Sequence, residues 1–200
     1  MSNLEHQVLF EFLNNISPVS DELWGEISRF IRQKSYTKGE CILREGEIET
    51  RSNVVIKGVV HQFVYDDDVT ITTNLTPSGF PFNSLKSYIE GSPSIEVQEA
   101  ITDVDLLYME KQDLEDLVIR SHEFSYLMYK IHENILLDRE NRMFLLQYRN
   151  PSKRFRLFHE SVERSKGLTG CTPDKFLASY LNMTPQQYSR EKRNLKKLHC

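Results

Sequence analysis

The sequence predicts an α+β fold in which a region of short strands is flanked by helices. From Tyr36 to Met109, short apolar runs alternate with turn residues such as Lys38-Gly39 and Pro77-Ser78-Gly79, a spacing typical of an antiparallel sandwich or barrel. Before and after this region, apolar residues recur every three or four positions, as they do in amphipathic helices. Near the C-terminus, two short helical patterns with a very short join outline a helix-turn-helix.

The helices and strands of the first half can be placed from this pattern. Apolar spacing indicates helices from Leu4 to Ile16 and from Leu23 to Ile31, and the second is expected to begin at Ser20. Helical periodicity returns at Lys111. The apolar runs between these helices place strands at residues 41–43, 54–56, 59–65, 69–75, 95–101 and 106–109.

A long helix is expected from Glu123 to about Tyr148. Its apolar residues form a stripe long enough to serve as the seam of a dimer. An ordinary helix packed on its own β region explains the stripe equally well, so both interpretations stay open. The residues assigned to the stripe are Phe124, Leu127, Ile131 and Ile135.

The segment that follows is expected to be a separate C-terminal unit. Asn150-Pro151 ends the long helix and marks a boundary, so the chain divides into residues 1–120, 121–150 and 151–200. Thr172-Pro173 and Thr184-Pro185 each place a hydroxyl N-cap before a proline at the first helical position. Thr184 with Gln187 also has the pattern of a capping box. In a helix-turn-helix, the second helix enters the DNA major groove.

The charge is distributed unevenly along the chain. Residues 1–150 hold 14 Lys and Arg against 25 Asp and Glu, whereas residues 151–200 hold 11 against 4. The two balances, −11 and +7, sum to the net charge of −4. An acidic body with a basic tail suits a partner with dense phosphate charge that approaches only the C-terminal end.

Several classes of protein are excluded by composition. No run of 18 apolar residues is present and the first ten residues lack the features of a signal peptide, so a cytoplasmic protein without a membrane partner is expected. The cysteines Cys41, Cys171 and Cys200 are too far apart to indicate a disulfide framework, an iron–sulfur cluster or a zinc site. His61 is the only histidine from Tyr36 to Met109. A cupin-type metalloenzyme needs several imidazoles close together, so we expect no enzyme, no metal and no cofactor.

Three motifs in order resemble the cyclic-nucleotide-receptor and fumarate–nitrate-reduction regulators of bacteria, the Crp/Fnr family. Residues 36–60, with Lys38-Gly39-Glu40, Glu45-Gly46 and Ile56-Lys57-Gly58, resemble the opening of the family's β-roll. The stretch LLYMEKQDLEDL, residues 106–117, resembles the exit from that roll. Residues 177–190, LASYLNMTPQQYSR, are similar to the family's helix-turn-helix, in the form common among Bacteroidetes-like sequences.

This resemblance implies a complete architecture and set of partners. The β region would be a sensory domain, an antiparallel double-stranded β-helix of jelly-roll type. The long helix would join two copies into a homodimer, and the C-terminal unit would be a winged helix-turn-helix, for which Gly167 to Gly170 leaves room for a tight turn or small wing. The expected partners are a pseudo-palindromic double-stranded DNA site, a second copy of the chain and RNA polymerase.

The family's phosphate-binding signature is absent from this sequence. The resemblance places Asn83-Ser84 where the family has Gly-Glu, and Ser94-Ile95 where it has Arg followed by Ser or Thr. A buried phosphate needs a charged bidentate donor such as arginine, whereas Ser94 supplies a neutral hydroxyl. We therefore expect no binding of cyclic AMP and an unidentified effector. The degenerate pocket is assigned to Asn83, Ser84, Leu85, Ser94 and Ile95.

The expected DNA-reading face lies on the last helix. If Tyr188 and Leu195 face inward, Gln186, Arg190, Arg193 and Lys197 share the opposite face. Arginine can contact guanine and glutamine can contact adenine, so Arg190 is the first candidate for base reading and Gln186 the second. Gln187 and Ser189 would supplement them. Lys192, Lys196, Lys197 and the Thr184 backbone would meet phosphates.

Two functions from different classes remain open on the sequence alone. A dimeric, sequence-specific transcription regulator is the leading interpretation. A ligand-binding or scaffold module that does not read DNA is the alternative, because Glu191 stands where the family usually has an apolar residue that packs against the first helix.

Overall fold

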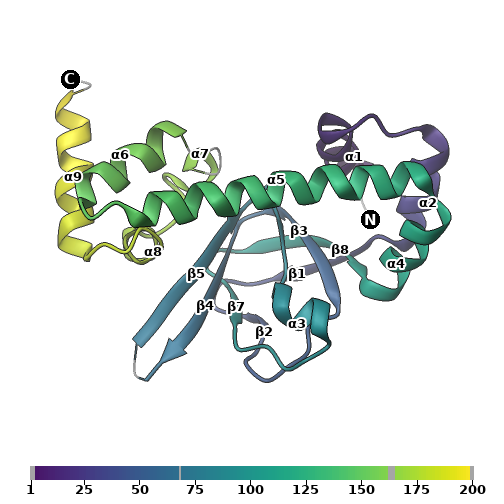
Figure 1. Ribbon diagram of the computed structural model, residues 1–200, viewed down its shortest axis with the longest axis horizontal. Helices are drawn as coiled ribbons and strands as arrows, with labels where there is room; N and C mark the ends of the chain where they lie inside the picture. The colour runs from purple at the N-terminus through teal and green to yellow at the C-terminus, as the bar shows by residue number, and fades with distance from the viewer. Residues whose placement is uncertain (1–2, 68, 162–164, 199–200) are drawn as a thin grey trace.

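The computed structural model describes residues 3–67, 69–161 and 165–198 and has the expected mixture of helices and strands (Figure 1). Helices α1 (Asn3–Ile16) and α2 (Asp21–Phe30) precede the strands. The Ser20 side chain accepts a hydrogen bond from the backbone N–H of Leu23 at 3.1 Å, which confirms the expected N-cap of α2. In the described part of the chain, no helix is long and apolar enough to cross a bilayer.

The described strands form two antiparallel four-stranded sheets, which together we call the β-roll. One sheet has the order β1-β8-β3-β6 and the other β2-β7-β4-β5. The long turn-linked pair β4 and β5 extends beyond the rest of the roll (Figure 1). The strand bounds are β1 (Arg32–Tyr36), β2 (Cys41–Leu43), β3 (Arg51–Lys57), β4 (Val59–Asp66), β5 (Val69–Pro77), β6 (Pro81–Phe82), β7 (Val97–Ala100) and β8 (Val104–Glu110).

Gly58 makes the tight turn between β3 and β4 possible. Its φ is +89°, and an added Cβ would lie 2.1 Å from the backbone oxygen of Asp103, so a side chain is excluded by both conformation and space. Several short elements were missed by the sequence pattern. The edge strand β1 is mostly polar, β6 has only two residues, and the short helix α3 (Leu85–Glu90) interrupts the strand region. The four-residue helix α7 (Ser165–Leu168) was missed too.

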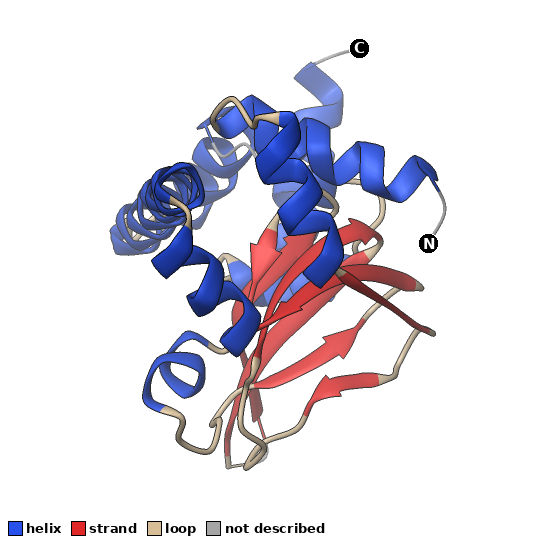
Figure 2. Ribbon diagram, turned by 90° about the vertical axis from the view of Figure 1, so that its right-hand side faces the viewer, coloured by secondary structure: helices blue, strands red, loops and turns tan. Residues whose placement is uncertain are grey.

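The long helix α5 (His122–Gln147) follows α4 (Lys111–Arg120) and passes across the roll (Figure 1). Ser121 caps it by accepting a hydrogen bond from the backbone N–H of Phe124 at 3.1 Å. Figure 2 shows the helices gathered above and to one side of the strands.

The assignment of the α5 stripe to a dimer seam is wrong for its buried residues. Phe124, Leu127 and Ile131 are 3%, 1% and 8% exposed, because they pack against α1, α2 and α4 of the same chain. Ile135 is partly buried against the same cluster. Side chains already covered by their own chain are not free to meet a second copy. A different face of α5 is exposed.

The C-terminal unit consists of α6 (Pro151–Ser161), α7 (Ser165–Leu168), α8 (Asp174–Tyr180) and α9 (Pro185–Leu198). Within residues 151–161 and 165–198 there is no strand, so these residues do not form the expected wing. Gly167 instead lies against the roll, where an added Cβ would be 3.0 Å from the Cβ of Pro77. Residues 169–171 form a turn, which was the alternative to a wing in the sequence analysis.

One hydrophobic core joins the roll to the C-terminal helices. Val59 and Leu75 of the roll belong to the same buried cluster as Leu145 of α5, Phe158 of α6 and Leu177 of α8. The cluster therefore crosses the boundary expected at Asn150-Pro151. The C-terminal helices are packed on the roll rather than attached only through the end of α5.

Candidate nucleic-acid interface

The helix-turn-helix is formed by α8, a turn at residues 181–184 and α9, which stands at one end of the molecule (Figure 1). Asn182 has φ +51°, a left-handed conformation that asparagine tolerates better than most residues. Thr184 and Gln187 form the predicted capping box: the Thr184 N–H donates to Gln187 Oε1 at 2.9 Å, and the Gln187 N–H donates to Thr184 Oγ1 at 3.2 Å. The first predicted cap is displaced by one residue, because Pro173 rather than Thr172 holds the N-cap position of α8.

The inner side of α9 is fixed by the core. Tyr188 is 1% exposed and Met183 just before the helix is 7% exposed, and Leu195 packs partly buried against the same cluster. These three positions confirm the expected orientation of the helix. Burial raises the pKa of the Tyr188 hydroxyl well above its usual value.

Arg154 of α6 holds the turn of the helix-turn-helix, a role that the sequence pattern did not reveal. Its side chain is buried and donates to three backbone oxygens, those of Leu181 at 2.8 Å, Asn182 at 2.6 Å and Tyr148. The planar guanidinium has five N–H donors in a fixed fork, so it can serve two neighbouring carbonyls of the turn and one at the end of α5 at once. Arg154 therefore joins the end of α5 to the turn before α9.

The outer side of α9 carries exposed polar and basic side chains. Gln186, Ser189, Arg190 and Arg193 are all exposed, and their spacing of three and four places them on the side away from Tyr188. The expected base-reading residues are therefore brought together on one surface. The side chains of Lys196 and Lys197 lie outside the described residues.

Several groups that were expected to contact DNA make ion pairs or hydrogen bonds within the chain. Arg190 Nε lies 3.1 Å from the carboxylate of Glu191, and Lys192 Nζ lies 2.7 Å from that of Asp174 on α8. The capping box uses the Thr184 N–H and the Gln187 side-chain oxygen, so a phosphate would have to compete with Gln187 for this N–H, and the contact stays a prediction. The Glu191 side chain is 11% exposed. A largely buried carboxylate can replace the usual apolar residue at this position because Arg190 pairs with it.

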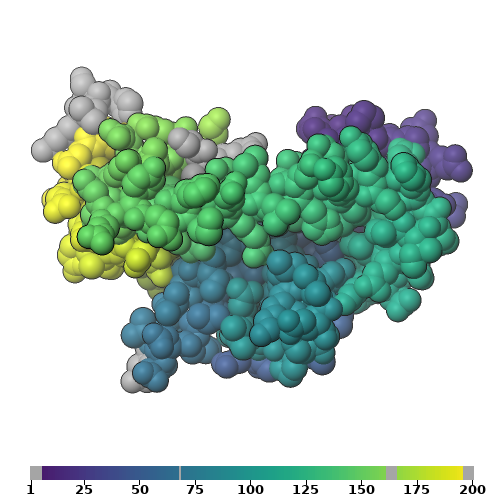
Figure 3. Space-filling model, viewed as in Figure 1, coloured from purple at the N-terminus to yellow at the C-terminus, as the bar shows by residue number. Residues whose placement is uncertain are grey.

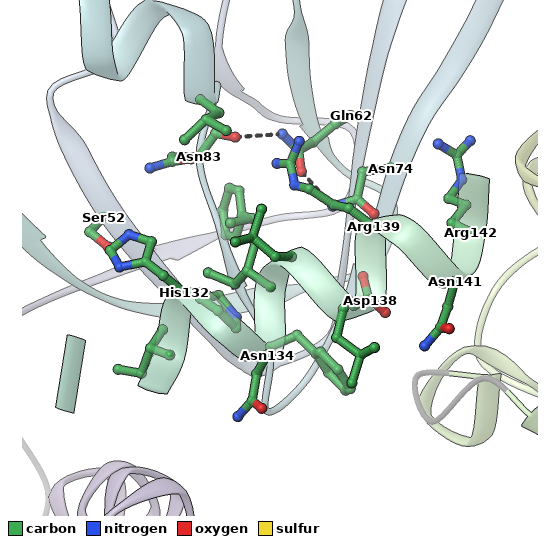
Figure 4. A pocket seen from close by; sticks show the side chains of 18 of the residues that line it. Ser52, Gln62, Asn74, Asn83, His132, Asn134, Asp138, Arg139, Asn141 and Arg142 are labelled. Carbon is green, nitrogen blue, oxygen red and sulfur yellow. Dashed lines mark hydrogen bonds between the residues drawn. The ribbon is translucent and has the colours of Figure 1, made fainter. Parts of the chain in front are cut away.

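A large groove lies between α5 and the roll, and its volume is about 1310 Å³. Figure 4 shows Gln62 of β4 and Asn74 of β5 on the roll side, and Arg139 extending from α5. Asn83 and Leu85, both assigned to the degenerate pocket, line this groove. Its charged lining residues are of both signs, namely Glu96, Asp138, Arg139 and Arg142.

The other residues of the degenerate pocket are divided between interior and surface. Ser84 and Ser94 are buried with their hydroxyl oxygens 2.8 Å apart, whereas Ile95 is 64% exposed. The Ser84 N–H donates to Glu49 Oε2 at 3.3 Å, and Gln98 Nε2 donates to the same oxygen at 3.0 Å. Burial raises the pKa of the Glu49 carboxyl. The Glu49 carboxyl group thus lies beside Ser84, one of the residues assigned to the degenerate pocket.

His61 is enclosed between the roll and α8. Its Nε2 lies 2.9 Å from Thr72 Oγ1, and its ring lies 4.7 Å from the rings of both Phe63 and Phe176. Burial, assisted by the charge of Lys175, lowers the pKa of His61 to about 4. Among the described residues, no group of three or more His, Cys, Asp or Glu side chains could hold a metal ion.

The buried His61 should make stability depend on pH. Because its pKa falls to about 4 in the folded state and is about 6.5 in an unfolded chain, the unfolded state binds more protons between these values. The wild type should lose about 2 to 3 kcal/mol of unfolding free energy through this residue as pH falls from 7 to 4. Urea unfolding at both pH values should show a smaller loss for His61→Gln. The exposed control His122→Gln should behave as wild type, and equal pH dependence in all three proteins would contradict the assignment.

Replacing Arg154 should weaken the helix-turn-helix. Arg154→Met removes three charge-assisted hydrogen bonds and leaves buried carbonyls unpaired, so unfolding free energy should fall by about 2 to 4 kcal/mol. Arg156→Met is the matched control on the same helix, because Arg156 is 64% exposed and makes only a 3.9 Å ion pair with Glu160. Its expected change is within about 0.5 kcal/mol. Equal losses in the two variants, measured by urea denaturation, would refute the bracing role of Arg154.

No protein-family model and no curated protein sequence matches the chain. Solved structures do share its fold. FixK2 of Bradyrhizobium japonicum has a TM-score of 0.71 at 20% identity, over 84% of this chain and 86% of that chain. A CooA mutant of Carboxydothermus hydrogenoformans has a TM-score of 0.65 at 18% identity, over 94% and 84%.

A third similar structure is CLP of Xanthomonas campestris, described as a c-di-GMP responsive global regulator that links cell–cell signalling to virulence gene expression. Its TM-score is 0.63 at 18% identity, over 86% of this chain and 91% of that chain. These structures have a β-roll and a C-terminal helix-turn-helix. The chain therefore has the fold of the Crp/Fnr regulators.

Proposed function

We propose that this protein is a sequence-specific DNA-binding transcription regulator that acts as a homodimer in the cytoplasm. The observation that carries the proposal is the exposed face of α9, which presents Gln186, Ser189, Arg190 and Arg193 at the end of the molecule. A helix held from behind by Tyr188 and Met183 can insert its outer face into a major groove without disturbing the core. The fold shared with regulators supports the same function.

Arg190 is the proposed base-reading residue. Its side chain is 58% exposed and its Nε pairs with Glu191, so the terminal guanidinium nitrogens can contact guanine. Arg190 is the exposed partner of this ion pair, so a base edge can compete with Glu191 for its side chain. Gln186 and Arg193 extend the contact, and RNA polymerase is the expected protein partner at the promoter.

The second face of α5 is the proposed dimer surface. Its large apolar side chains are more than half exposed, and three of them, at 129, 136 and 143, recur every seven residues. Figure 3 shows α5 as a band across the exposed face of the molecule. An uncovered apolar stripe of this kind marks an association surface. Its residues are Tyr126, Tyr129, Leu136, Leu137, Met143 and Phe144.

The roll is proposed to sense something other than cyclic AMP. Ser84 and Ser94 bond to each other, and the nearby Ser84 N–H donates to the Glu49 carboxylate. An incoming phosphate would meet this negative charge without an arginine beside Ser94 to offset it. We therefore propose that the effector is a small molecule that fits the groove under α5.

Arg190→Ala should abolish sequence preference. DNA selected from a random pool by the wild-type protein should be bound roughly 5- to 150-fold more weakly by this variant, because one bidentate base contact contributes about 1–3 kcal/mol. Fluorescence anisotropy with selected and random duplexes measures the difference. Arg44→Ala is the control, since Arg44 is 72% exposed on the roll. If the wild type binds every duplex equally across salt concentrations, the protein does not read sequence and the ligand-binding or scaffold alternative is favoured.

Leu136→Glu should convert the dimer to a monomer. The change places a charge within the apolar stripe, and sedimentation velocity should show about half the wild-type mass. Ile119→Glu on α4 is the matched control, because Ile119 is 82% exposed outside the stripe. The α5 interface would be ruled out by a wild type that is monomeric, or by a Leu136→Glu protein that remains dimeric.

A further inference from the structure

We propose that the β-roll holds a second, smaller binding site, which takes a small primary alkylammonium ion at the buried carboxylate of Glu49. This site, which we call the Glu49 pocket, is separate from the groove under α5, because the two share no lining residue in the described part of the chain. A ligand can occupy it without DNA, so the site does not depend on the proposed function.

The Glu49 pocket lies between β2, β3 and β7 and has a volume of about 170 Å³. The pairing of Leu43 with Gln98 brings β2 beside β7, and Asn53 of β3 lines the same space. A cavity of about 150 Å³ can hold a ring of about six carbon atoms. The pocket is therefore large enough for a small organic molecule, whereas the groove under α5 has space for a much larger one.

Three polar side chains that line this pocket are almost completely buried. Glu49, Asn53 and Gln98 are 5%, 2% and 0% exposed. Gln98 Nε2 donates to Glu49 Oε2 at 3.0 Å, whereas Gln98 Oε1 is buried and has no hydrogen-bond partner among the described residues. A buried acceptor without a donor is unfavourable. A ligand with N–H groups would supply the donor that this oxygen needs.

Among the described residues, the hydrogen bonds to the Glu49 carboxylate come from neutral groups. Its Oε1 accepts from the Arg51 backbone N–H at 3.1 Å, and its Oε2 accepts from the Ser84 N–H and from Gln98. The charged end of Arg51 is engaged elsewhere, because its Nε lies 3.3 Å from Glu110. Burial outweighs these contacts and raises the pKa of the Glu49 carboxyl. A bound cation would supply the opposite charge that favours the ionised carboxylate.

The rest of the pocket suits a short aliphatic chain. Its apolar lining residues are Ile42, Leu43 and Ile48. Ile48 is 50% exposed and the side chain of the neighbouring Glu47 is 48% exposed, so these two residues mark the side from which a ligand can enter. An alkyl chain of a few carbons would contact the apolar residues while its ammonium group meets Glu49.

The groups that line the pocket favour an organic cation over a metal ion. Among the described residues, no group of three or more His, Cys, Asp or Glu side chains could hold a metal ion. An ammonium group instead has three N–H donors, which suit the Glu49 carboxylate and the unpaired oxygen of Gln98. The apolar wall, which offers nothing to a bare ion, is used by the alkyl chain.

Titration of the full chain with n-butylammonium tests the site, and 1-butanol is the neutral probe of the same length. Two-dimensional NMR should show saturable shifts of the side-chain amide signals of Gln98 and Asn53. The ammonium should bind at least about 10-fold more tightly than the alcohol, because charge-assisted hydrogen bonds are stronger than neutral ones.

Glu49→Gln keeps the shape of the side chain but removes its charge, so the preference for the ammonium should fall below about 2-fold. Glu47→Gln is the matched control and should keep the preference, because Glu47 lies at the entrance and pairs with Arg44 at 3.7 Å. Gln98→Met removes the unpaired oxygen and should weaken ammonium binding about 5-fold or more. This second variant decides the question if Glu49→Gln does not fold.

The site is ruled out if the wild type binds neither probe, or if it binds both equally. It is also ruled out if Glu47→Gln lowers the preference as much as Glu49→Gln does. These measurements need no DNA, so failure of the Glu49 pocket and failure of the proposed function can be told apart.

Discussion

The contact between the β-roll and the C-terminal helices is the constraint on which the rest of the structure depends. Leu75 and Val59 of the roll are buried with Leu177 and Phe158 of the C-terminal helices. Burying this apolar surface stabilises the arrangement and also fixes where α9 points. A helix-turn-helix attached only through the end of α5 could rotate, whereas this one has a defined position.

Helix α5 contributes side chains to two hydrophobic cores and also has an exposed apolar face. Its first half packs through Phe124, Leu127 and Ile131 with the N-terminal helices, and Leu145 near its end joins the core of the C-terminal helices. The intervening segment passes over the groove and exposes Leu136 and Leu137. One helix thus borders the sensory groove, the proposed dimer partner and the helix-turn-helix.

Charge and packing have separate roles in the proposed mechanism. The acidic balance of residues 1–150 and the basic balance of residues 151–200 orient the molecule toward DNA. In the free protein, however, Arg190 of α9 pairs with Glu191 on the same helix, and Lys192 pairs with Asp174 of α8. In this proposal, the charge balance of the chain sets its long-range attraction to DNA. The ion pairs that DNA would have to replace on binding are set by the side chains next to Arg190 and Lys192.

Local signals allowed most elements to be predicted. Ser20 and the Thr184–Gln187 capping box fixed helix starts because their hydrogen bonds reach only three residues. Apolar runs located most strands, but β1 was missed, since an edge strand such as RQKSY needs few apolar residues. The exposed positions of Gln186, Ser189, Arg190 and Arg193 followed from helical periodicity and the inward Tyr188.

The sequence by itself determined the order of roll, long helix and helix-turn-helix, and the character of the reading face. Only the tertiary structure decided that Phe124, Leu127 and Ile131 pack within their own chain, because periodicity shows that a face is apolar but not what covers it. The role of Arg154 and the contact of His61 with Phe176 also depend on segments far apart in the chain. Such contacts arise when distant elements pack, and no local pattern records them.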